Sequence, residues 1–355
     1  MTTTNVTMQQ RRDTSANWKT NNPVINSGEI CFETDTGKMK IGNGKDNYLS
    51  LPYKANDDIY KMTDKLYDGV DLSVKFADEI KNYSDVWAWI KARITANNYD
   101  GIHVGDYIPF ALSAGTISDG STSYSIGAKT LNAQIAGIDT YYGYGDTAVG
   151  HHIDFISTAC IGTNIPFNPT DNNNGTATYP NPWLASKIYA CLNGVNNVST
   201  GYNNVAHGFN ASSCGILQLL PVALQNQIKT KRMYMPTRYS ASGILTNSPA
   251  GAWCDAGKLW LPTEMEVYGC PIHSASTAKA TDGLDFASLG TPVQYPLFAN
   301  CAGYRNNKIK ARVSWWLSSV PSGSSTHACN VNIGGSAHAS GCAIAWPSAP
   351  VCFRI

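Results

Sequence analysis

The chain has 355 residues, a formal net charge of +1 and 14% charged side chains. This length predicts two or three domains with a sizeable core. The near-neutral charge, without any run of Lys or Arg, excludes nucleic acid and anionic membranes as partners held by charge alone. The sequence lacks both a stretch of about 18 apolar residues and the apolar segment of a secretory signal, so we expect synthesis in the cytoplasm without membrane insertion.

The ten cysteines are scattered singly along the chain. They form no C-x-x-C pair, and no cluster of Cys and His has the spacing of a zinc site. We therefore expect most of them to be small buried hydrophobic residues. The sequence predicts neither a metal site nor a cofactor.

A β-hairpin is predicted within residues 1–53. Its strands cover residues 29–34 and 38–42, and Asp35 and Gly37 supply the turn between them. The apolar residues of the hairpin are Ile30, Phe32 and Ile41. They are too few for a domain of this size to stand alone, so we expect self-association.

This segment closely resembles the N-terminal repeat domain of phage tail proteins, a family that includes tropism determinants, tail fibres and hyaluronidases. The matching residues are Arg11, Arg12, Asp13, Trp18, Asn22, Pro23, Gly28, Glu29, Ile30, Thr34, Asp35, Thr36, Gly37, Lys38, Lys40, Ile41, Gly42, Gly44, Leu51, Pro52 and Tyr53. The chain departs from the family at Asn43, where an Asp is usual. The resemblance implies that residues 1–53 form a small β-prism-like trimerisation module that joins other phage tail proteins.

Residues 54–83 have a polar, helical pattern, which predicts a helical connector. Its apolar residues at helical spacing are Ile59, Met62 and Leu66. The connector either packs around a symmetry axis or is an ordinary amphipathic helix. Ser84 is then predicted to cap a helix over residues 85–94, whose aromatic stripe we expect to lie in a core.

Residues 84–355 resemble a C-type lectin fold of the variety found in phage and gut-bacterial variable proteins. The residues that carry the resemblance are G-D-Y-I at 105–108, L-W-L-P-T-E-M-E-V-Y-G at 259–269, W-W-L at 315–317 and V-C-F-R-I at 351–355. The resemblance implies that the first and last strands pair, which would place residues 104–110 beside 351–355. The expected fold class is therefore α+β and rich in strands.

Two long stretches of this region, residues 170–178 and 240–253, are too rich in Asn, Gly and Ser to predict regular elements. We expect them to be loops over the core, or inserts.

The run H-H-I-D-F-I invites a metal or catalytic hypothesis. Strand alternation would place His152 and Asp154 on one face and His151 on the other, so no convergent triad follows. We expect a hydrogen-bonded structural pair. The calcium-dependent sugar loops of vertebrate lectins, with motifs such as E-P-N and W-N-D, are absent from the sequence, so calcium-mediated glycan capture is not predicted.

The last residues, 315–355, have an unusual composition. Between Arg312 and Arg354 there is no charged residue, although about six would be expected from average usage. Composition alone would favour a flexible tail. The apolar brackets at 315–317 and 351–353 argue instead for buried strands around a surface-exposed filling.

Nearly every residue from 322 to 349 is one that an Asn codon reaches when its adenines are replaced, and Trp346 is the exception. The pattern resembles the variable region of diversity-generating retroelement proteins, where adenine-directed change rewrites ligand contacts on a fixed scaffold. The resemblance implies that one contiguous, solvent-exposed patch binds the ligand, with Trp346 in it or buried beside it. The implied contact residues are Ser324, Thr326, His327, Asn330, Asn332, Ile333, Ser336, His338, Ser340, Ile344, Trp346 and Ser348.

Together, the resemblances imply a phage receptor-binding protein that determines tropism. We expect a homotrimer at the tip of a tail or fibre of the virion, made in the bacterial cytoplasm, that binds a protein or glycan of the host surface.

The alternative is a lectin-fold or polysaccharide-degrading enzyme. The candidates for its catalytic groups are Cys329, Cys342, Cys352, His327 and His338. Cys329 and Cys342 lie among small residues, and no nearby carboxylate would orient the histidines. We therefore expect binding without enzymatic activity and predict no catalytic residue.

Overall fold

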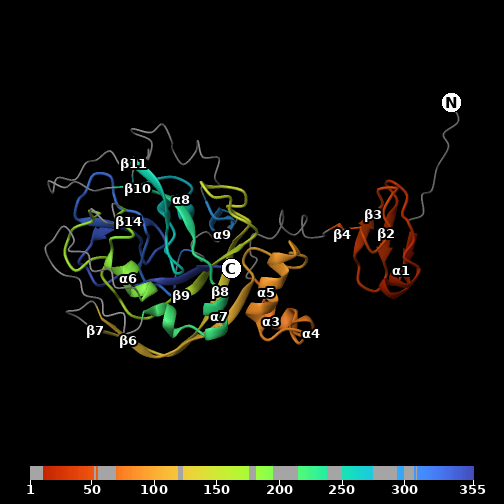
Figure 1. Cartoon of the computed structure of the whole chain (residues 1–355), viewed down its shortest axis with the longest axis horizontal. Coiled ribbons are helices and arrows are strands. Elements are labelled where there is room, and N and C mark those ends of the chain that lie inside the picture. Colours follow the sequence, from red (N-terminus) through yellow and green to blue (C-terminus); the bar gives the residue numbers. More distant parts are fainter. Residues whose placement is uncertain are drawn as a thin grey trace. The chain divides into compact units, whose positions relative to one another are not determined.

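The structure is a computed structural model, and it forms two compact units, Met1–Lys65 and Leu66–Ile355 (Figure 1). Each unit has a hydrophobic core of its own. The residues that the structure describes are 11–51, 53–54, 69–118, 123–175, 181–194, 215–237, 250–274, 294–299, 308 and 310–355.

The first unit is a four-stranded sheet with helix α1, Ser15–Asn21, which Thr14 caps. The strands, in their order across the sheet, are β1 Arg11–Asp13, β2 Ile30–Glu33, β3 Met39–Ile41 and β4 Tyr53–Lys54. Strands β2 and β3 pair antiparallel, which confirms the predicted hairpin. Gly37 takes a φ of +70° in the turn, a conformation that glycine adopts at little cost.

The two faces of this sheet are buried to different degrees. The core residues of the unit are Trp18, Ile25, Cys31, Tyr48 and Leu51. Ile30, Phe32 and Ile41 lie on the other face and stay half-buried, because alternation along β2 and β3 turns Cys31 and Lys40 inward instead. An apolar sheet face therefore remains partly open to solvent.

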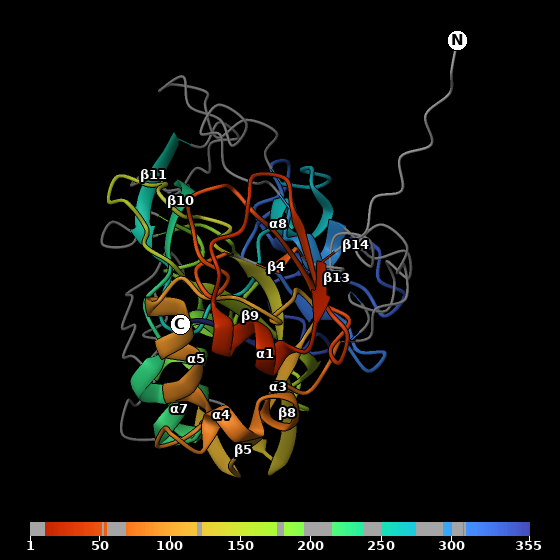
Figure 2. The ribbon, with the colours of Figure 1, turned by 90° about the vertical axis from the view of Figure 1, so that its right-hand side faces the viewer.

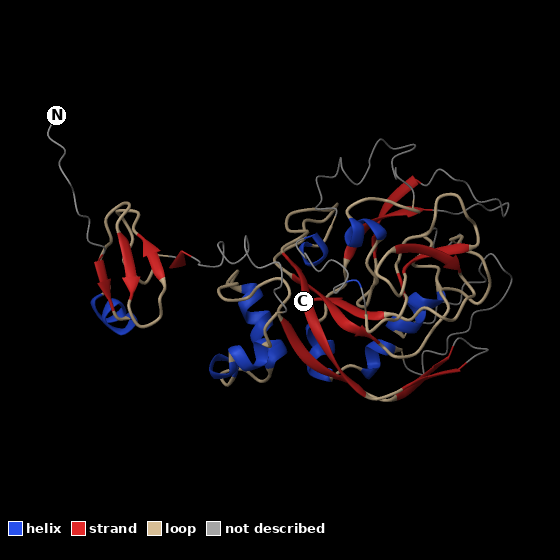
Figure 3. Ribbon diagram, turned by 180° about the vertical axis from the view of Figure 1, so that it is seen from behind, coloured by secondary structure: helices blue, strands red, loops and turns tan. Residues whose placement is uncertain are grey.

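The second unit is an α+β fold, rich in strands, with open sheets joined by long loops (Figure 3). Its main sheet is antiparallel, with the order β15, β9, β8, β5. The bounds of these strands are β5 Tyr107–Leu112, β8 Lys129–Ile138, β9 Ile153–Cys160 and β15 Pro350–Arg354.

The first and last strands of this unit do not pair, which corrects the arrangement expected for residues 104–110 and 351–355. Strands β5 and β15 lie at opposite edges of the main sheet. The long strands β8 and β9 take the centre because their residues are buried almost throughout, as a central position requires.

The remaining strands form smaller antiparallel sheets. They are β6 Gly115–Ser118, β7 Ser123–Ile126, β10 Arg232–Thr237, β11 Ala250–Asp255, β12 Trp315–Trp316, β13 His327–Val331 and β14 Ala337–Gly341. Strand β11 corrects the expectation of a loop at residues 250–253, which pair with β10, whereas residues 240–249 and 176–178 of the predicted loops lie outside the described residues. Residues 170–175 form no regular element, as predicted.

Short helices complete the second unit. They are α3 Leu72–Lys75, α4 Ala77–Ile80, α5 Val86–Thr95, α6 Lys187–Asn193, the 3₁₀ helix η2 Ile216–Leu219, α7 Val222–Gln227, α8 Glu264–Tyr268 and α9 Pro296–Ala299. Helices α5 and α7 lie side by side (Figure 2). Helices α3 and α4 lie within the predicted connector, whereas Ile59, Met62 and Leu66 fall outside the described residues.

Helix α5 confirms the prediction for residues 85–94, but its cap is Asp85 and not Ser84. The Asp85 carboxylate accepts from the backbone N–H groups of Trp87 and Ala88, at 2.8 and 2.9 Å. The aromatic stripe is in the core, as expected, since Trp87 meets the Phe353 ring edge-on at 5.8 Å between centroids.

Candidate binding surface

The bracket strands of the C-terminal region are buried, as predicted. Trp315 and Trp316 form β12, are fully buried, and pair with the end of β13. Their indole N–H groups donate to the backbone carbonyls of Lys308 and Ile165, both at 2.7 Å. On the other side of residues 322–349, every residue of β15 is buried. The segment between the brackets is therefore anchored at both ends.

Strands β13 and β14 form a hairpin that carries the middle of this segment. Residues Asn330 and His338 lie opposite each other across it. At its tip, the Asn332 side chain accepts from the backbone N–H groups of Gly334 and Ser336, at 2.8 and 3.1 Å. Such a side-chain turn fixes the backbone of the tip without fixing the side chains around it.

Most of the predicted contact residues reach solvent. Ile333 is 58% exposed, Trp346 is 42% exposed and Ile344 is 36% exposed. The rings of His338 and Trp346 meet edge-on, with centroids 6.2 Å apart. We define the candidate face as the exposed and half-exposed members of the predicted set: Ser324, Thr326, His327, Asn332, Ile333, Ser336, His338, Ile344 and Trp346.

Asn330, Ser340 and Ser348 are buried, so the expectation that they project into solvent is wrong. The Asn330 side-chain amide donates to the Ser340 hydroxyl at 2.8 Å. The Ser348 hydroxyl donates to the Thr163 carbonyl at 2.6 Å. These hydrogen bonds offset part of the cost of burial, although the Asn330 side-chain oxygen has no partner, and the three residues belong to the support.

A small polar network forms the other exposed corner of the face. The Ser324 and Thr326 hydroxyls lie 2.9 and 2.8 Å from Nδ1 of His327. Because hydroxyls donate or accept with equal ease, this corner offers both kinds of group to a ligand.

The Asn-rich loop at residues 170–175 is hydrogen-bonded to the backbone of this corner. The Asn173 side-chain amide donates to the carbonyls of Ser324 and His327, both at 2.6 Å. The Asn173 backbone N–H donates to the Ser325 carbonyl at 2.9 Å. Asn173 is fully buried, so these bonds hold the backbone of the face in a dry environment.

Asp171 holds the next turn of the candidate face. Its carboxylate accepts from the backbone N–H of Ala343 at 2.8 Å. A Cβ at Gly341 would lie 2.7 Å from the same carboxylate, so a larger residue there would disturb the brace. This support was not predicted, although Asn and Asp side chains commonly bond backbone groups and their abundance in residues 170–175 was a usable signal.

Helix α8 contacts the segment between β12 and β13, which leads into the candidate face. Thr263 and Glu266 form a capping box at its start. The buried Glu264 carboxylate accepts from the backbone N–H groups of Ile272, His273 and Ser274, at 2.8 to 3.1 Å. The Ser319 hydroxyl accepts from the Glu264 N–H at 2.9 Å. Glu264 was part of a recognised motif, but its buried role was not predicted.

The candidate catalytic groups of the alternative hypothesis do not form a reactive centre within the described residues. Cys329, Cys342 and Cys352 are all buried, as expected of small hydrophobic residues. Burial raises the pKa of the Cys329 and Cys352 thiols well above the usual value, so both stay protonated. His327 faces hydroxyls, and His338 faces Ser340 and Trp346. Among the described residues Cys270 is the exposed cysteine.

His152 and Asp154 share one side of the strand, as predicted, but they are not hydrogen-bonded to each other. Nε2 of His152 lies 3.9 Å from the Asp154 carboxylate and accepts from the Tyr141 N–H at 3.2 Å. Burial lowers the pKa of His152, which keeps the ring neutral. Both residues are structural, and His151 pairs instead with Asp139 at 2.7 Å.

The main partner of Asp154 is Arg354, which binds both carboxylate oxygens at 2.7 Å. Next to this pair, Lys231 binds Glu266 at 2.6 Å. Two buried cations thus face two buried anions, so the formal charges of these four residues cancel.

Within the described residues, no three His, Cys, Asp or Glu side chains lie close enough together to hold a metal ion. None of the described helices is long and apolar enough to cross a membrane.

A family model matches the N-terminal part of the chain. Residues 8–46 match the model of the major tropism determinant N-terminal domain. The match confirms the resemblance proposed for the N-terminal segment. It does not extend to the second unit, so the lectin-like resemblance stays a prediction. Comparison with curated proteins finds no match.

Three solved structures match a part of the chain, each with a TM-score of 0.16. One is a group A streptococcal phage-encoded tail fibre showing hyaluronan lyase activity, 29% identical over 23% of this chain and 26% of that one. Another is a hyaluronate lyase associated with a Streptococcus pyogenes bacteriophage, 29% identical over 23% of this chain and 25% of that one. The third is a hyaluronidase trimer in complex with ascorbic acid, 26% identical over 26% of this chain and 29% of that one.

These matches contradict our expectation of a chain without enzymatic activity, because the proteins that share the matched part are described as hyaluronan-degrading enzymes. That expectation is withdrawn. The chain spans only 25 to 29% of the length of these structures, and so small an overlap assigns none of their activity to it. Through residues 8–46, the chain is therefore related to phage tail proteins of the major tropism determinant type.

Proposed function

We propose that this protein is a receptor-binding protein of a phage tail, which attaches to the bacterial surface through the candidate face. The proposal rests on the contrast between a fixed backbone and exposed side chains in residues 322–349. Buried Asn173 and exposed Asp171 bond to the backbone of this segment, while the side chains of the candidate face reach solvent. The domain match at residues 8–46 supports a place in the tail of the virion.

The composition of the candidate face suits it to the recognition of a ligand. It carries exposed Trp346, Ile333 and Ile344 beside small polar groups, and no charged residue lies between Arg312 and Arg354. An exposed Trp next to adaptable hydroxyls is a common arrangement at binding hot spots. The ligand is a protein or a glycan of the host surface.

Diversification by a retroelement fits the same arrangement, and so does a C-type lectin-like scaffold. Exposed positions tolerate exchange among Asn, Ser, His and Ile at a cost that usually stays within about 0.5 kcal/mol. Buried Asn330, Ser340 and Ser348 would not, since an unpaired buried polar group costs about 1 to 3 kcal/mol. In this proposal, variation is therefore confined to the candidate face.

A homotrimer follows from the small first unit, for which we propose a β-prism-like arrangement. Its core is a small cluster around Trp18 and Tyr48. The opposing pair Ile30 and Ile41, together with Phe32, leaves an apolar sheet face half-buried. Packing against two further copies would cover it. Three faces on one trimer would then combine weak contacts into firm attachment, where geometry permits simultaneous engagement.

Competition for adsorption tests the proposed function. The purified protein should block attachment of the phage that carries it, and the triple variant Ile333→Ser, Ile344→Ser and Trp346→Ser should not. The matched control replaces exposed apolar residues elsewhere on the second unit, Val74→Ser, Val222→Ser and Tyr142→Ser, and should block as well as the unchanged protein. Equal blocking by both variants would show that the face does not bind the host.

A further inference from the structure

A short loop beside the candidate face carries an exposed isoleucine. Gly269 caps the C-terminal end of α8 with a φ of +76°, a conformation that favours glycine. We call the residues from this glycine onward, 269–274 with the sequence G-C-P-I-H-S, the α8 loop. The Ile272 side chain is 51% exposed, close to the 58% of Ile333 in the candidate face.

A buried carboxylate holds the α8 loop in one conformation. The Glu264 side chain is fully buried. It accepts from the backbone N–H groups of Ile272, His273 and Ser274, at 2.8 to 3.1 Å, and from the Ser274 hydroxyl at 2.7 Å. Pro271 restricts the backbone just before the isoleucine. Because the loop is already fixed, little conformational freedom is lost when a partner covers its exposed apolar side chain.

Hydrogen bonds join both ends of the α8 loop to the segment that carries the candidate face. The backbone N–H of Ser322 donates to the His273 carbonyl at 2.9 Å. Just before the loop, the Tyr268 hydroxyl donates to the carbonyl of Gly335, at the tip of the β13–β14 hairpin, at 3.1 Å. Ile272 lies between these two attachment points in the chain.

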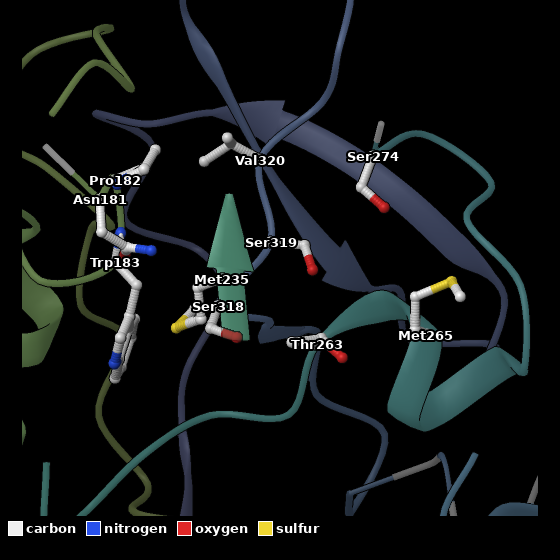
Figure 4. A pocket seen from close by; sticks show the side chains of 10 residues that line it. All are labelled: Asn181, Pro182, Trp183, Met235, Thr263, Met265, Ser274, Ser318, Ser319 and Val320. Carbon is white, nitrogen blue, oxygen red and sulfur yellow. Dashed lines mark hydrogen bonds between the residues drawn. The ribbon is translucent and has the colours of Figure 1, made fainter. Parts of the chain in front are cut away.

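The pocket in Figure 4 shows the same neighbourhood from the side of α8. Met265, Ser274, Ser319 and Val320 all line it. Ser274 also pairs with Pro321 in an antiparallel bridge. The α8 loop and the segment that leads into the candidate face therefore lie side by side.

The surface made by the α8 loop and the candidate face is apolar and uncharged. Neither residues 269–274 nor residues 313–353 include Asp, Glu, Lys or Arg. Its exposed large apolar side chains are Ile272, Ile333, Ile344 and Trp346. Aliphatic groups strip water from the hydroxyls of a sugar without replacing the lost hydrogen bonds, whereas they match the apolar centre of a protein interface. The composition therefore favours a protein ligand over a glycan.

We propose that Ile272 is a fixed contact of the receptor-binding surface and packs against an apolar side chain of a host surface protein. The inference rests on the proposed function and names the class of its partner. The α8 loop lies outside residues 322–349, so variation confined to the candidate face leaves Ile272 unchanged. Ile272 then contributes to attachment whatever side chains the candidate face carries.

Competition for adsorption tests the contribution of Ile272. The measured quantity is the concentration of full-length protein that halves attachment of the phage to host cells. Ile272→Thr keeps the branched shape but loses apolar area, and should raise this concentration by about fivefold, whereas Ile272→Val should stay within about twofold. The control is Val222→Thr, at a 70% exposed position on α7, which should behave as the unchanged protein. An unchanged concentration for Ile272→Thr overturns the proposal.

A second measurement needs no substitution at Ile272. Cys270, two residues away, is an exposed free thiol. Reaction with a bulky maleimide should abolish blocking by the unchanged protein, because the attached group covers the loop. Cys270→Ser, treated in the same way, should still block. Full blocking by the labelled protein overturns the proposal, even if Ile272→Thr does not fold.

Treatment of the host cells tests the class of the partner. Digestion of surface proteins with a protease should abolish attachment of the purified protein, and oxidation of surface sugars with periodate should leave it intact. Attachment that survives the protease and is lost after periodate identifies a glycan and overturns the proposal.

The candidate-face triple variant separates this inference from the proposed function. Loss of blocking in the triple variant, together with unchanged blocking by Ile272→Thr, leaves the receptor-binding function standing and overturns the fixed contact. Unchanged blocking by both variants overturns the proposed function as well.

Discussion

The side-chain amide of Asn173 donates to the backbone carbonyl of His327 at 2.6 Å, although the two residues are 154 positions apart in the chain. The same amide bonds Ser324. One buried side chain thus holds the start of the candidate face through backbone atoms alone. Because these bonds end on backbone atoms, they do not depend on which side chains residues 324 and 327 carry. A binding face with exchangeable residues requires such support.

Replacing this brace should therefore affect both stability and binding. Asn173→Ala leaves two part-buried carbonyls without their donor, and we expect a loss of about 1 to 3 kcal/mol in the free energy of unfolding, with weaker attachment. Chemical denaturation followed by a cell-binding assay measures both. The control is Asn82→Ala at an exposed position, which should change neither. Wild-type stability in Asn173→Ala would show that the brace is dispensable.

The two tryptophans at the edges of the region should behave in opposite ways. Trp316 is fully buried and Trp346 is 42% exposed. We expect Trp316→Ala to cost about 3 to 5 kcal/mol, as truncations of buried aromatic residues do. Trp346→Ala should cost about 0.5 kcal/mol and reduce attachment. Melting curves of both variants test this contrast, and similar shifts would contradict the assignment of support and face.

Acid should destabilise the second unit through Asp154. Burial alone would raise the pKa of this carboxyl, but the Arg354 guanidinium outweighs burial and holds the pKa below its ordinary value of 3.8. The ion pair therefore stabilises the fold above about pH 4, and this stabilisation is lost as the pH falls further. We expect the melting temperature to drop between pH 5 and pH 3.

The matched variant for this pH dependence is Asp154→Asn. It should melt at a lower temperature than the unchanged protein at pH 6, because Arg354 stays buried without its partner. Its further loss towards pH 3 should be smaller. Parallel pH profiles for the two proteins would rule out Asp154 as the source.

Assembly should depend on the half-buried face of the first unit. We expect a trimer in solution, and the pair of substitutions Ile30→Thr and Ile41→Thr should shift it towards monomer by removing apolar area from the contact. Light scattering at micromolar concentration measures the mass. The control, Val74→Thr with Val222→Thr, changes exposed apolar residues of the second unit and should stay trimeric. A monomeric unchanged protein would refute the assembly.

Local patterns in the sequence predicted local structure well. The turn at Gly37, the hairpin around it and the buried brackets at Trp315 and Trp316 are all confirmed, because each depends on residues close together in the chain. The strand pairing of the main sheet was not predicted. The most deeply buried strands take the centre of a sheet. Here β8 and β9 lie at the centre and so separate the first and last strands, β5 and β15.

For the candidate face, too, local features were predicted from the sequence and long-range contacts were not. Composition located the face, yet it did not tell Asn332, in the exposed turn, from Asn330, which is buried. The two have identical side chains. Asn330 lies within β13 and bonds Ser340, whereas Asn332 lies beyond the end of that strand and forms the turn. The hydrogen bonds of Asn173 join residues that are far apart in the chain. A single sequence does not show which distant residues will meet.

The most direct test of the account replaces the whole candidate face at once and measures folding and attachment together. The replaced residues are Ser324, Thr326, His327, Ile333, Ser336, His338, Ile344 and Trp346, each changed to Ala, with Asn332 kept because it forms the turn. We predict a melting temperature within a few degrees of the unchanged protein and no detectable attachment to host cells. Attachment at the level of the unchanged protein, or loss of the fold, would contradict the claim that a fixed backbone presents a replaceable binding face.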